Sequence, residues 1–317
     1  MHLFPTLRNY KKENLGKDIL AGLIIMAVSI PISMGYAQIA GLPAVYGLYG
    51  SVLPILFFAV FSTSPQFIFG VDAAPAALVG SALLSMGIES GSEEAMRAVP
   101  VLTLFVALWL FAFSYMKAGK LVNYISAPVM GGFITGICTT IILMQIPSAG
   151  VGEFFELAVH IGESLEKLNL PSLLLGLFAL FILLLSKKLI PKFPMAVLLM
   201  AAGACMTKFL PLKKWGVVTL SAVDPGLMPF ALPDLSVIPV REAVTISLSV
   251  AIVIMAETLL AENSFAQKNG YRINDNQEIF AFAMGNLIAA LTGCCPINGS
   301  VSRTAMGEQD QARTQLT

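Results

Sequence analysis

Residues 64–75 read SPQFIFGVDAAP, and residues 294–303 read CCPINGSVSR. In each stretch a proline begins a short run of extended character that ends at a glycine, and a run of small residues compatible with a helix follows. Apolar segments broken at corresponding places in two halves of a chain are typical of secondary transporters, whose binding sites lie near the middle of the bilayer. A helix that begins inside the membrane points free N–H groups and a positive dipole end at its surroundings. Two such helix starts facing each other are predicted to hold an anion.

The composition indicates an integral membrane protein. The chain has 317 residues, of which 56% are hydrophobic and 12% are charged, whereas a soluble domain carries about 25% charged residues. The formal net charge is zero, so there is no basic surface that would indicate a nucleic-acid partner. The four cysteines have no metal-ligand spacing, and His2 and His160 are isolated. We therefore expect no metal, no cofactor and no nucleic acid, and a lipid bilayer as the surroundings.

The hydrophobic segments predict an all-α polytopic fold. A membrane-spanning helix needs about 20 mostly apolar residues, and we predict ten hydrophobic elements with loose ends. They lie at residues 18–40, 44–62, 65–88, 98–116, 125–147, 170–186, 193–210, 240–263, 277–292 and 296–311. As domains, 1–17 is a cytoplasmic N-terminal segment, 18–210 holds seven elements, 211–239 is an extracellular proline-rich loop, and 240–317 holds three elements.

Elements one to three and eight to ten repeat one order, which is a long helix, a helix and a broken helix. Because seven elements precede the second triplet, its sense in the membrane is reversed, and this is the pattern of an inverted repeat. We predict a transporter fold of two inverted seven-helix repeats. The first repeat and the first three elements of the second lie within these residues, so we expect the chain to be a fragment of a longer protein.

The basic residues predict the orientation of the chain. With the N-terminus in the cytoplasm, twelve lysines and arginines fall inside and six fall outside, with Arg303 set aside because it lies within an element. The outside cluster of Lys208, Lys213 and Lys214 is the main exception. We expect a multi-pass protein of the cell (inner) membrane with a cytoplasmic N-terminus.

The first broken element offers Asp72 and Ala73 at a predicted helix start. Asp72 is either a helix N-cap, with Pro75 in the first turn, or a group that contacts the substrate. The two roles compete, because an ionised Asp72 would neutralise the positive helix end that an anion needs. The small residues that begin with Ala73 allow close approach of a substrate or of a neighbouring backbone.

The second broken element offers Ser300, Ser302 and Arg303, together with Asn298. Hydroxyl and N–H groups can replace the water shell of an oxyanion, and a guanidinium adds a fixed positive charge and bidentate geometry. The alternatives are that Ser300 or Ser302 caps the helix and that Arg303 extends to the inner membrane interface.

Glu257 lies in the apolar run VIMAETLL, residues 253–260. A carboxyl group is costly in such a run, so Glu257 is a functional candidate, which we expect to take up and release a proton during transport. The alternative is a structural ion pair, for example with Arg303. Glu262, five residues later, is expected at the membrane interface.

Several motifs resemble the SulP family of sulfate permease-type anion transporters. They are PISMGYA at 31–37, IAGLPAVYGLY at 39–49, NQE at 276–278 with GN at 285–286, GSVSRTA at 299–305 and ARTQL at 312–316. Together they follow the family's order over nearly the whole chain.

The resemblance implies two inverted seven-helix repeats divided into core and gate domains, with transport by an elevator-like movement of the core against the gate. It also implies a homodimer and a cytoplasmic STAS domain. The STAS domain and the last four membrane helices are absent from these residues. The implied anion site lies between the facing ends of the third and tenth elements and is walled by the first. Its residues here would be Tyr36, Asp72, Ala73, Ser300, Ser302 and Arg303.

The chain departs from the family pattern at three places. Ile32 stands where the family often has Gln, and EQDQ at 308–311 is more acidic than usual. By this resemblance, Glu257 and Ala261 stand where sodium-coupled bicarbonate members have an Asp and a Thr. Because a hard cation needs several oxygen ligands and Ala261 offers none from its side chain, we prefer proton coupling through Glu257 over sodium.

The sequence therefore predicts a secondary active transporter of a small anion, such as sulfate, bicarbonate or a dicarboxylate, coupled to protons. Sodium-coupled bicarbonate transport and anion exchange are the alternatives within transport. A non-transporting fragment or an accessory membrane subunit is the alternative of another class. The sequence shows no Ser/His/Asp set and no nucleotide-binding loop, so we do not expect an enzyme.

Overall fold

The computed structural model describes residues 4–7, 12–120, 170–190, 195–217, 230–309 and 314–316, with a few residues between 128 and 139. The chain divides into two compact units. The larger unit comprises residues 1–145 and 226–317, and the smaller comprises residues 146–225. The predicted element at 125–147 lies almost entirely outside the described residues, as does the acidic segment at 149–169.

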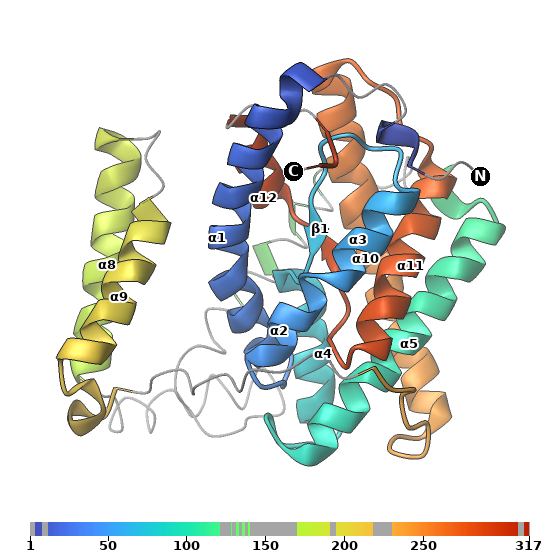
Figure 1. Cartoon of the computed structure of the whole chain (residues 1–317). Coiled ribbons are helices and arrows are strands. Elements are labelled where there is room, and N and C mark those ends of the chain that lie inside the picture. The colour runs from blue at the N-terminus through green and yellow to red at the C-terminus, as the bar shows by residue number, and fades with distance from the viewer. Residues whose placement is uncertain are drawn as a thin grey trace. The chain divides into compact units, whose positions relative to one another are not determined.

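The larger unit is built almost entirely of helices (Figure 1). Three of the described helices, α1, α5 and α10, are long and apolar enough to cross a membrane. In chain order the helices are η1 (Pro5–Leu7), η2 (Lys12–Asn14), α1 (Leu15–Ile39), α2 (Val45–Gly50), α3 (Leu53–Phe61), α4 (Ala73–Ser85), α5 (Glu93–Tyr115), α10 (Val240–Asn269), α11 (Asp275–Leu291) and α12 (Val301–Gln309).

Four of the elements predicted for this unit are single helices whose ends differ from the predicted ones. A fifth is divided into two helices. The predictions at 18–40, 98–116, 240–263 and 277–292 correspond to α1, α5, α10 and α11. The single element predicted at 44–62 is wrong, because the chain forms α2 and α3 there. Val52 leaves helical geometry between them, with φ −115° and ψ −84°, and Pro54 begins the second helix.

The two predicted breaks are present, and their extended stretches pair with each other. Strand β1 (Phe69–Gly70) is antiparallel to β2 (Asn298–Gly299), with Phe69 opposite Gly299 and Gly70 opposite Asn298. β1 leads into α4, and β2 leads into α12 (Figure 1). The pairing satisfies backbone groups that an irregular segment would otherwise leave bare in an apolar interior.

An aromatic stack holds the first break against the helices beside it. The ring of Phe69 in β1 stacks on Phe58 of α3, at a centroid distance of 4.5 Å, and on Phe282 of α11, at 5.3 Å. Gly285 of α11 leaves room for this stack, since a Cβ there would lie 3.0 Å from the Phe69 ring. Buried aromatic pairs of this kind stabilise a fold beyond their area of contact.

Helix α1 is positioned by a close approach to α2. A Cβ on Gly47 would lie 2.1 Å from the backbone oxygen of Ser33, so only glycine is accommodated there. The Ser51 hydroxyl also donates to the Ser33 hydroxyl at 2.8 Å. α1 contacts α4 and α12 as well, and it therefore forms a wall beside both half-helices.

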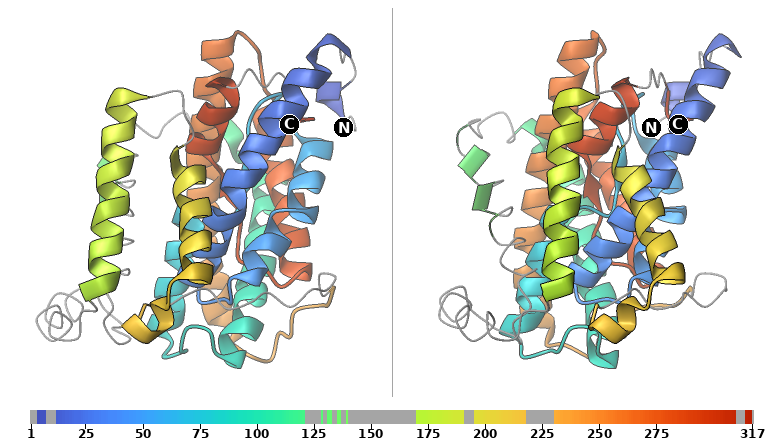
Figure 2. Two further views of the ribbon diagram at one scale, coloured as in Figure 1. Left: turned by 60° about the vertical axis from the view of Figure 1, so that its left-hand side comes forward. Right: turned by 90° about the vertical axis from the view of Figure 1, so that its left-hand side faces the viewer.

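The start of α1, the C-terminal end of α10 and residues 314–316 lie at one end of the larger unit (Figure 1 and Figure 2). The Thr314 hydroxyl donates to the Asp18 carboxylate at 2.6 Å, and the Gln315 amide donates to the carbonyls of Ser64 and Phe67 at 2.6 Å and 3.0 Å. α1 and α10 thus run in opposite senses, as the reversed triplets predict.

The described part of the smaller unit comprises α8 (Leu170–Leu189), α9 (Met195–Phe209) and η4 (Leu212–Trp215), and α8 packs against α9. These helices correspond to the elements predicted at 170–186 and 193–210. Large apolar side chains are exposed along α8, as expected of a helix whose surroundings are lipid. Examples are Leu174, Leu177, Phe178, Phe181 and Leu184.

Candidate functional site

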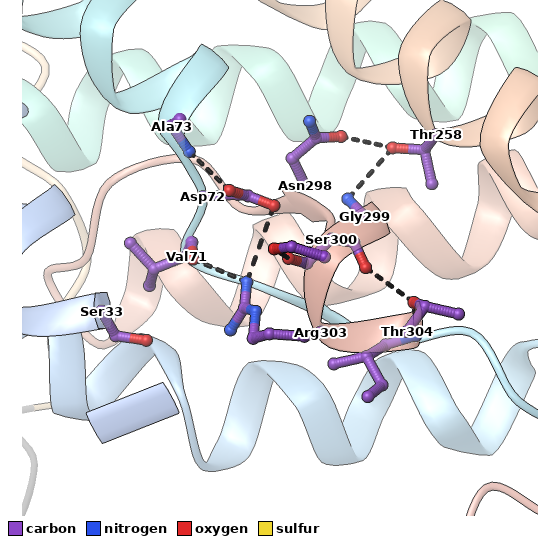
Figure 3. Close-up of polar contacts among 12 residues, drawn as sticks. Ser33, Val71, Asp72, Ala73, Thr258, Asn298, Gly299, Ser300, Arg303 and Thr304 are labelled. Atoms are coloured by element: carbon purple, nitrogen blue, oxygen red, sulfur yellow. Dashed lines mark hydrogen bonds and ion pairs between the residues drawn. The ribbon is translucent and has the colours of Figure 1, made fainter. Parts of the chain in front are cut away.

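The two half-helices α4 and α12 begin close together, because their leading strands are paired (Figure 3). The Ser300 amide donates to the Ile68 carbonyl at 2.8 Å, and the Ile68 amide donates to the Thr304 hydroxyl at 3.0 Å. These two bonds tie the start of α12 to the strand that leads into α4. The starts of both half-helices therefore lie in one region of the larger unit.

Asp72 has the N-cap role that was considered for it. One carboxylate oxygen accepts a hydrogen bond from the Ala73 amide at 2.8 Å. The other oxygen lies 3.8 Å from Nη2 of Arg303. Asp72 therefore caps α4 with one oxygen and faces the guanidinium with the other, and its contact with a substrate stays a prediction.

Arg303 is buried, with 1% of its side chain exposed, so the alternative position at the membrane interface is wrong. α12 begins at β2, and in its first turn Val301 and Ser302 are exposed whereas Arg303 is buried. Nη2 donates to the Val71 carbonyl at 2.7 Å. Within the described part of the chain, Nε and Nη1 are buried and have no hydrogen-bond partner. Leaving such donors bare costs about 1–3 kcal/mol each, which a bound oxyanion would recover.

Glu257 reaches the site through Asn298. The side-chain amide of Asn298 donates to Glu257 Oε2 at 2.8 Å, and its oxygen accepts from the Thr258 hydroxyl. The Gly299 amide in turn donates to the Thr258 hydroxyl at 3.1 Å. The adjacent residues Glu257 and Thr258 of α10 therefore hold β2 by a continuous chain of hydrogen bonds. The alternative ion pair between Glu257 and Arg303 is not formed, because the arginine pairs with Asp72.

The remaining predicted residues lie around this arrangement. Tyr36 is half-buried on α1, close enough to Arg303 for an electrostatic interaction. Ser300 lies beside Asp72, and its hydroxyl is 3.4 Å from that of Ser302. The structure therefore gathers the seven predicted residues in one region. Their use in transport stays a prediction.

Three contributors to the site were not singled out from the sequence. Thr258 directly follows Glu257 and would have been a reasonable addition, because an acid and a hydroxyl side by side on a helix suggest a polar contact. Thr304 lies one turn after Ser300, and its hydroxyl both accepts from Ile68 and donates to the Ser300 carbonyl. The Val71 carbonyl leaves no signal in a sequence, since every residue has one.

Glu262 lies apart from this site, and its predicted position at the membrane interface is wrong. Its side chain is fully buried, at 0% exposure, and lies against Glu278 of α11. The burial depends on a tertiary contact that no local pattern shows. Among the described residues, no group of three or more His, Cys, Asp or Glu side chains is arranged to hold a metal ion.

Comparison with known proteins agrees with the sequence motifs. The family model described as the sulfate permease family matches residues 15–317. A probable sulfate transporter of Mycobacterium tuberculosis is 29% identical over 314 residues, which cover 98% of this chain and 56% of the relative. The sulfate transporter of Bubalus bubalis is 27% identical over 348 residues, which cover 96% of this chain and 47% of the relative. This chain therefore spans about half the length of these curated relatives.

Solved structures share the fold. SLC26A9 superposes with a TM-score of 0.89 at 24% identity, over 98% of this chain and 53% of that protein. The transmembrane domain of BicA, a cyanobacterium bicarbonate transporter, superposes with a TM-score of 0.83 at 19% identity, over 97% of this chain and 80% of that domain. The predicted all-α membrane fold with two broken helices is confirmed by these likenesses.

Proposed function

Because the chain belongs to the sulfate permease family, we propose that it binds a small anion between the starts of α4 and α12 and carries it across the cell membrane. The observation that carries this proposal is Arg303. Its guanidinium is buried at the start of a half-helix, with two nitrogens that have no partner among the described residues. Such a group is already held in place to receive an anionic oxygen.

Backbone groups support the same assignment. The first N–H groups of a helix have no partner within it, and the helix end carries a partial positive charge. Here two helices begin beside each other, after Asp72 and after Ser300. The hydroxyls of Ser300 and Ser302 add donors at the same place, so an oxyanion would exchange its water shell for protein hydrogen bonds.

The charges of the site support proton coupling through Glu257. Asp72 offsets the charge of Arg303, and Glu257 lies near enough to Asp72 to interact with it electrostatically. An added anion would therefore be repelled by a charged Glu257 and tolerated by a protonated one. The Asn298 amide contacts Glu257 directly, so a change of charge there is transmitted to β2 and to the start of α12.

The substrate class follows from the chemistry of these donors. Convergent N–H and O–H groups with one guanidinium suit sulfate, bicarbonate or a small dicarboxylate. Sulfate is our first choice, because the curated relatives are named as sulfate transporters, and bicarbonate is the second, because BicA shares the fold. Sodium-coupled bicarbonate transport and anion exchange remain the alternatives.

We further propose an elevator-like movement of the half-helix core against a gate, in a homodimer of the inner membrane with a cytoplasmic N-terminus. The excess of basic residues on the predicted inner side supports this orientation. The opposite senses of α1 and α10 support the inverted repeat on which an elevator-like movement would depend.

Uptake into proteoliposomes tests the proposal. The full chain is reconstituted, and uptake of radiolabelled sulfate is measured under an inward proton gradient, an inward sodium gradient, or neither. We expect the proton gradient to drive uptake. The change Glu257→Gln should abolish this response and spare sulfate binding, because the amide mimics a carboxyl that never loses its proton. Glu242→Gln, at an exposed position of the same helix, should behave as the unchanged chain.

Each other outcome contradicts part of the proposal. Uptake that responds to sodium and not to protons would overturn proton coupling. Uptake that needs only an anion on the opposite side would identify an exchanger. A folded chain that takes up neither sulfate nor bicarbonate under any gradient would favour the accessory-subunit alternative.

A further inference from the structure

A second set of acidic side chains lies away from the anion site, where α10, α11 and the segment after α3 meet. Glu262 of α10 and Glu278 of α11 are both fully buried, at 0% exposure, and they lie against each other. Glu262 is five residues after Glu257, so the two side chains leave α10 in directions about 140° apart. The buried pair therefore faces away from the anion site.

The two carboxyl groups are satisfied very unequally. Glu278 accepts from the Ser62 hydroxyl at 2.8 Å, and from both the amide and the hydroxyl of Thr63. Within the described part of the chain, no N–H or O–H donor contacts either oxygen of Glu262, although both are buried, and the polar group within hydrogen-bonding range is the Glu278 carboxyl. A buried carboxylate without a donor is unstable, and two carboxylates in contact repel each other. Glu262 therefore needs a stabilising group beyond the contacts described above.

A positively charged side chain does not supply this stabilisation. The ion pairs of the described residues join Arg97 to Asp234, Lys268 to Glu308 and Arg303 to Asp72, and none involves Glu262 or Glu278. The other titratable groups facing the pair are Asp275 of α11 and Tyr271 of the turn before it. Asp275 adds negative charge. Burial raises the pKa of the Tyr271 hydroxyl, so this residue stays neutral.

We propose that Glu262 and Glu278 form a buried carboxyl pair that binds one proton between them, at a site separate from the anion site. The proton gives Glu262 a donor, directed at a Glu278 oxygen, and removes one of the two negative charges. A proton is favoured over a metal ion, because the described residues hold no group of three or more ligands of the metal-binding type. The proposal goes beyond the proposed transport function and does not depend on it.

The neighbours of the pair show what its proton would control. Ser62 and Thr63, which contact Glu278, begin the segment that runs into β1, and the Thr63 hydroxyl also accepts from the Asn274 amide at 3.0 Å. Loss of the proton would place two charges in contact where α10, α11 and this segment join. The folded state would then be weakened at the approach to the first break.

The pH dependence of stability tests the proposal without any transport assay. The thermal unfolding midpoint of the full chain in detergent is measured between about pH 5 and about pH 9. The folded pair keeps a proton that the unfolded chain gives up, so the folded state binds more protons and its stability falls as pH rises. We expect the midpoint to fall by at least about 2 °C over this range.

Matched variants assign the effect to the pair. In Glu262→Gln an amide N–H takes the place of the proton toward Glu278, so at least half of the pH slope should disappear. Glu242→Gln, at an exposed position of the same helix, should keep the full slope. An unchanged slope in Glu262→Gln overturns the proposal. A midpoint raised by sodium over choline in the unchanged chain, but not in Glu262→Gln, overturns it in favour of a metal cation.

Infrared spectroscopy tests the same point if Glu262→Gln does not fold. The spectrum is recorded near neutral pH on the Glu257→Gln chain, so that Glu257 does not contribute. We expect the carbonyl stretch of a protonated carboxylic acid, shifted by deuterium exchange. Its absence would show that both carboxyl groups are charged and would overturn the proposal.

Discussion

At the scale of single residues, Arg303 occupies space that Gly70 leaves open. A Cβ on Gly70 would lie 3.1 Å from Arg303 Nη1, so a side chain at position 70 would press against the guanidinium. The Val71 carbonyl accepts from Nη2 at 2.7 Å, and Asp72 lies 3.8 Å from the same nitrogen. Among the described residues, Nε and Nη1 have no hydrogen-bond partner.

Replacing Arg303 with lysine should weaken anion binding strongly. An ammonium group keeps the charge, but it has one nitrogen and cannot contact Val71 and an anion in the planar geometry of a guanidinium. Losing hydrogen bonds to a charged group costs about 1.5–3 kcal/mol, so we expect sulfate affinity to fall at least about tenfold. Titration calorimetry on the purified chain measures this change.

The control for this prediction is Arg272→Lys, which makes the same change at an exposed residue in the turn before α11. It should bind sulfate as the unchanged chain does. Equal affinity of Arg303→Lys and Arg272→Lys would show that Arg303 does not contact the anion.

The sequence predicts the local roles of residues better than their burial. The N-cap at Asp72 follows from residue type, because a short carboxylate is favoured before a helix wherever that helix lies. The burial of Arg303 and Glu262 depends on partners that are distant in the chain, which are Val71 and Glu278. A long side chain near a membrane surface can also extend to water, so composition alone does not separate the two positions.

At the scale of elements, each break can be recognised alone, but its partner cannot. Proline and glycine mark both segments, and two-residue strands carry no alternating pattern that would reveal their register. The pairing of Phe69 with Gly299 is therefore a tertiary result. It depends on Gly299, where a Cβ would lie 2.3 Å from the Phe67 ring and 2.6 Å from Thr258 Cγ2.

Replacing Thr258 with valine should weaken the attachment of β2 to α10, leaving the contact between Asn298 and Glu257. Valine has the shape of threonine but neither donates to Asn298 nor accepts from the Gly299 amide, which are both buried contacts. Leaving a buried polar group bare costs about 1–3 kcal/mol, and each kcal/mol lowers the unfolding midpoint by about 2–4 °C. Thermal unfolding in detergent measures the loss.

Thr245→Val is the matched control, on the same helix. Thr245 is exposed, and its hydroxyl donates only to the Arg241 carbonyl one turn earlier, at 2.9 Å. Its loss should change stability by less than about 0.5 kcal/mol. If both variants unfold at the same temperature, the contact between Thr258 and β2 does not support the fold.

At the scale of the whole molecule, composition and element order predict the membrane helices better than residue patterns predict the contacts of the site. Membrane-spanning helices are recognisable because crossing a bilayer requires about 20 mostly apolar residues. Helices α1, α5 and α10 are long and apolar enough to do so. The division of 44–62 into α2 and α3 was missed because hydropathy stays high across Val52, where only the backbone geometry changes.

Cysteine labelling of intact cells tests the predicted orientation. In a chain whose natural cysteines are replaced, Ser236→Cys lies before α10 and Arg272→Cys lies after it, both at exposed positions. With a cytoplasmic N-terminus, a membrane-impermeant maleimide should label Ser236→Cys alone, and Arg272→Cys only after permeabilisation. The reverse pattern would place the N-terminus outside.

The pairing of the two breaks also sets an order of events during synthesis. Among the described residues, the partner of the Ile68 amide is the Thr304 hydroxyl, which the ribosome adds 236 residues later. Until then the first break has reached the translocon with bare backbone groups that lipid cannot satisfy. The first break therefore gains these partners only after the second has been synthesised.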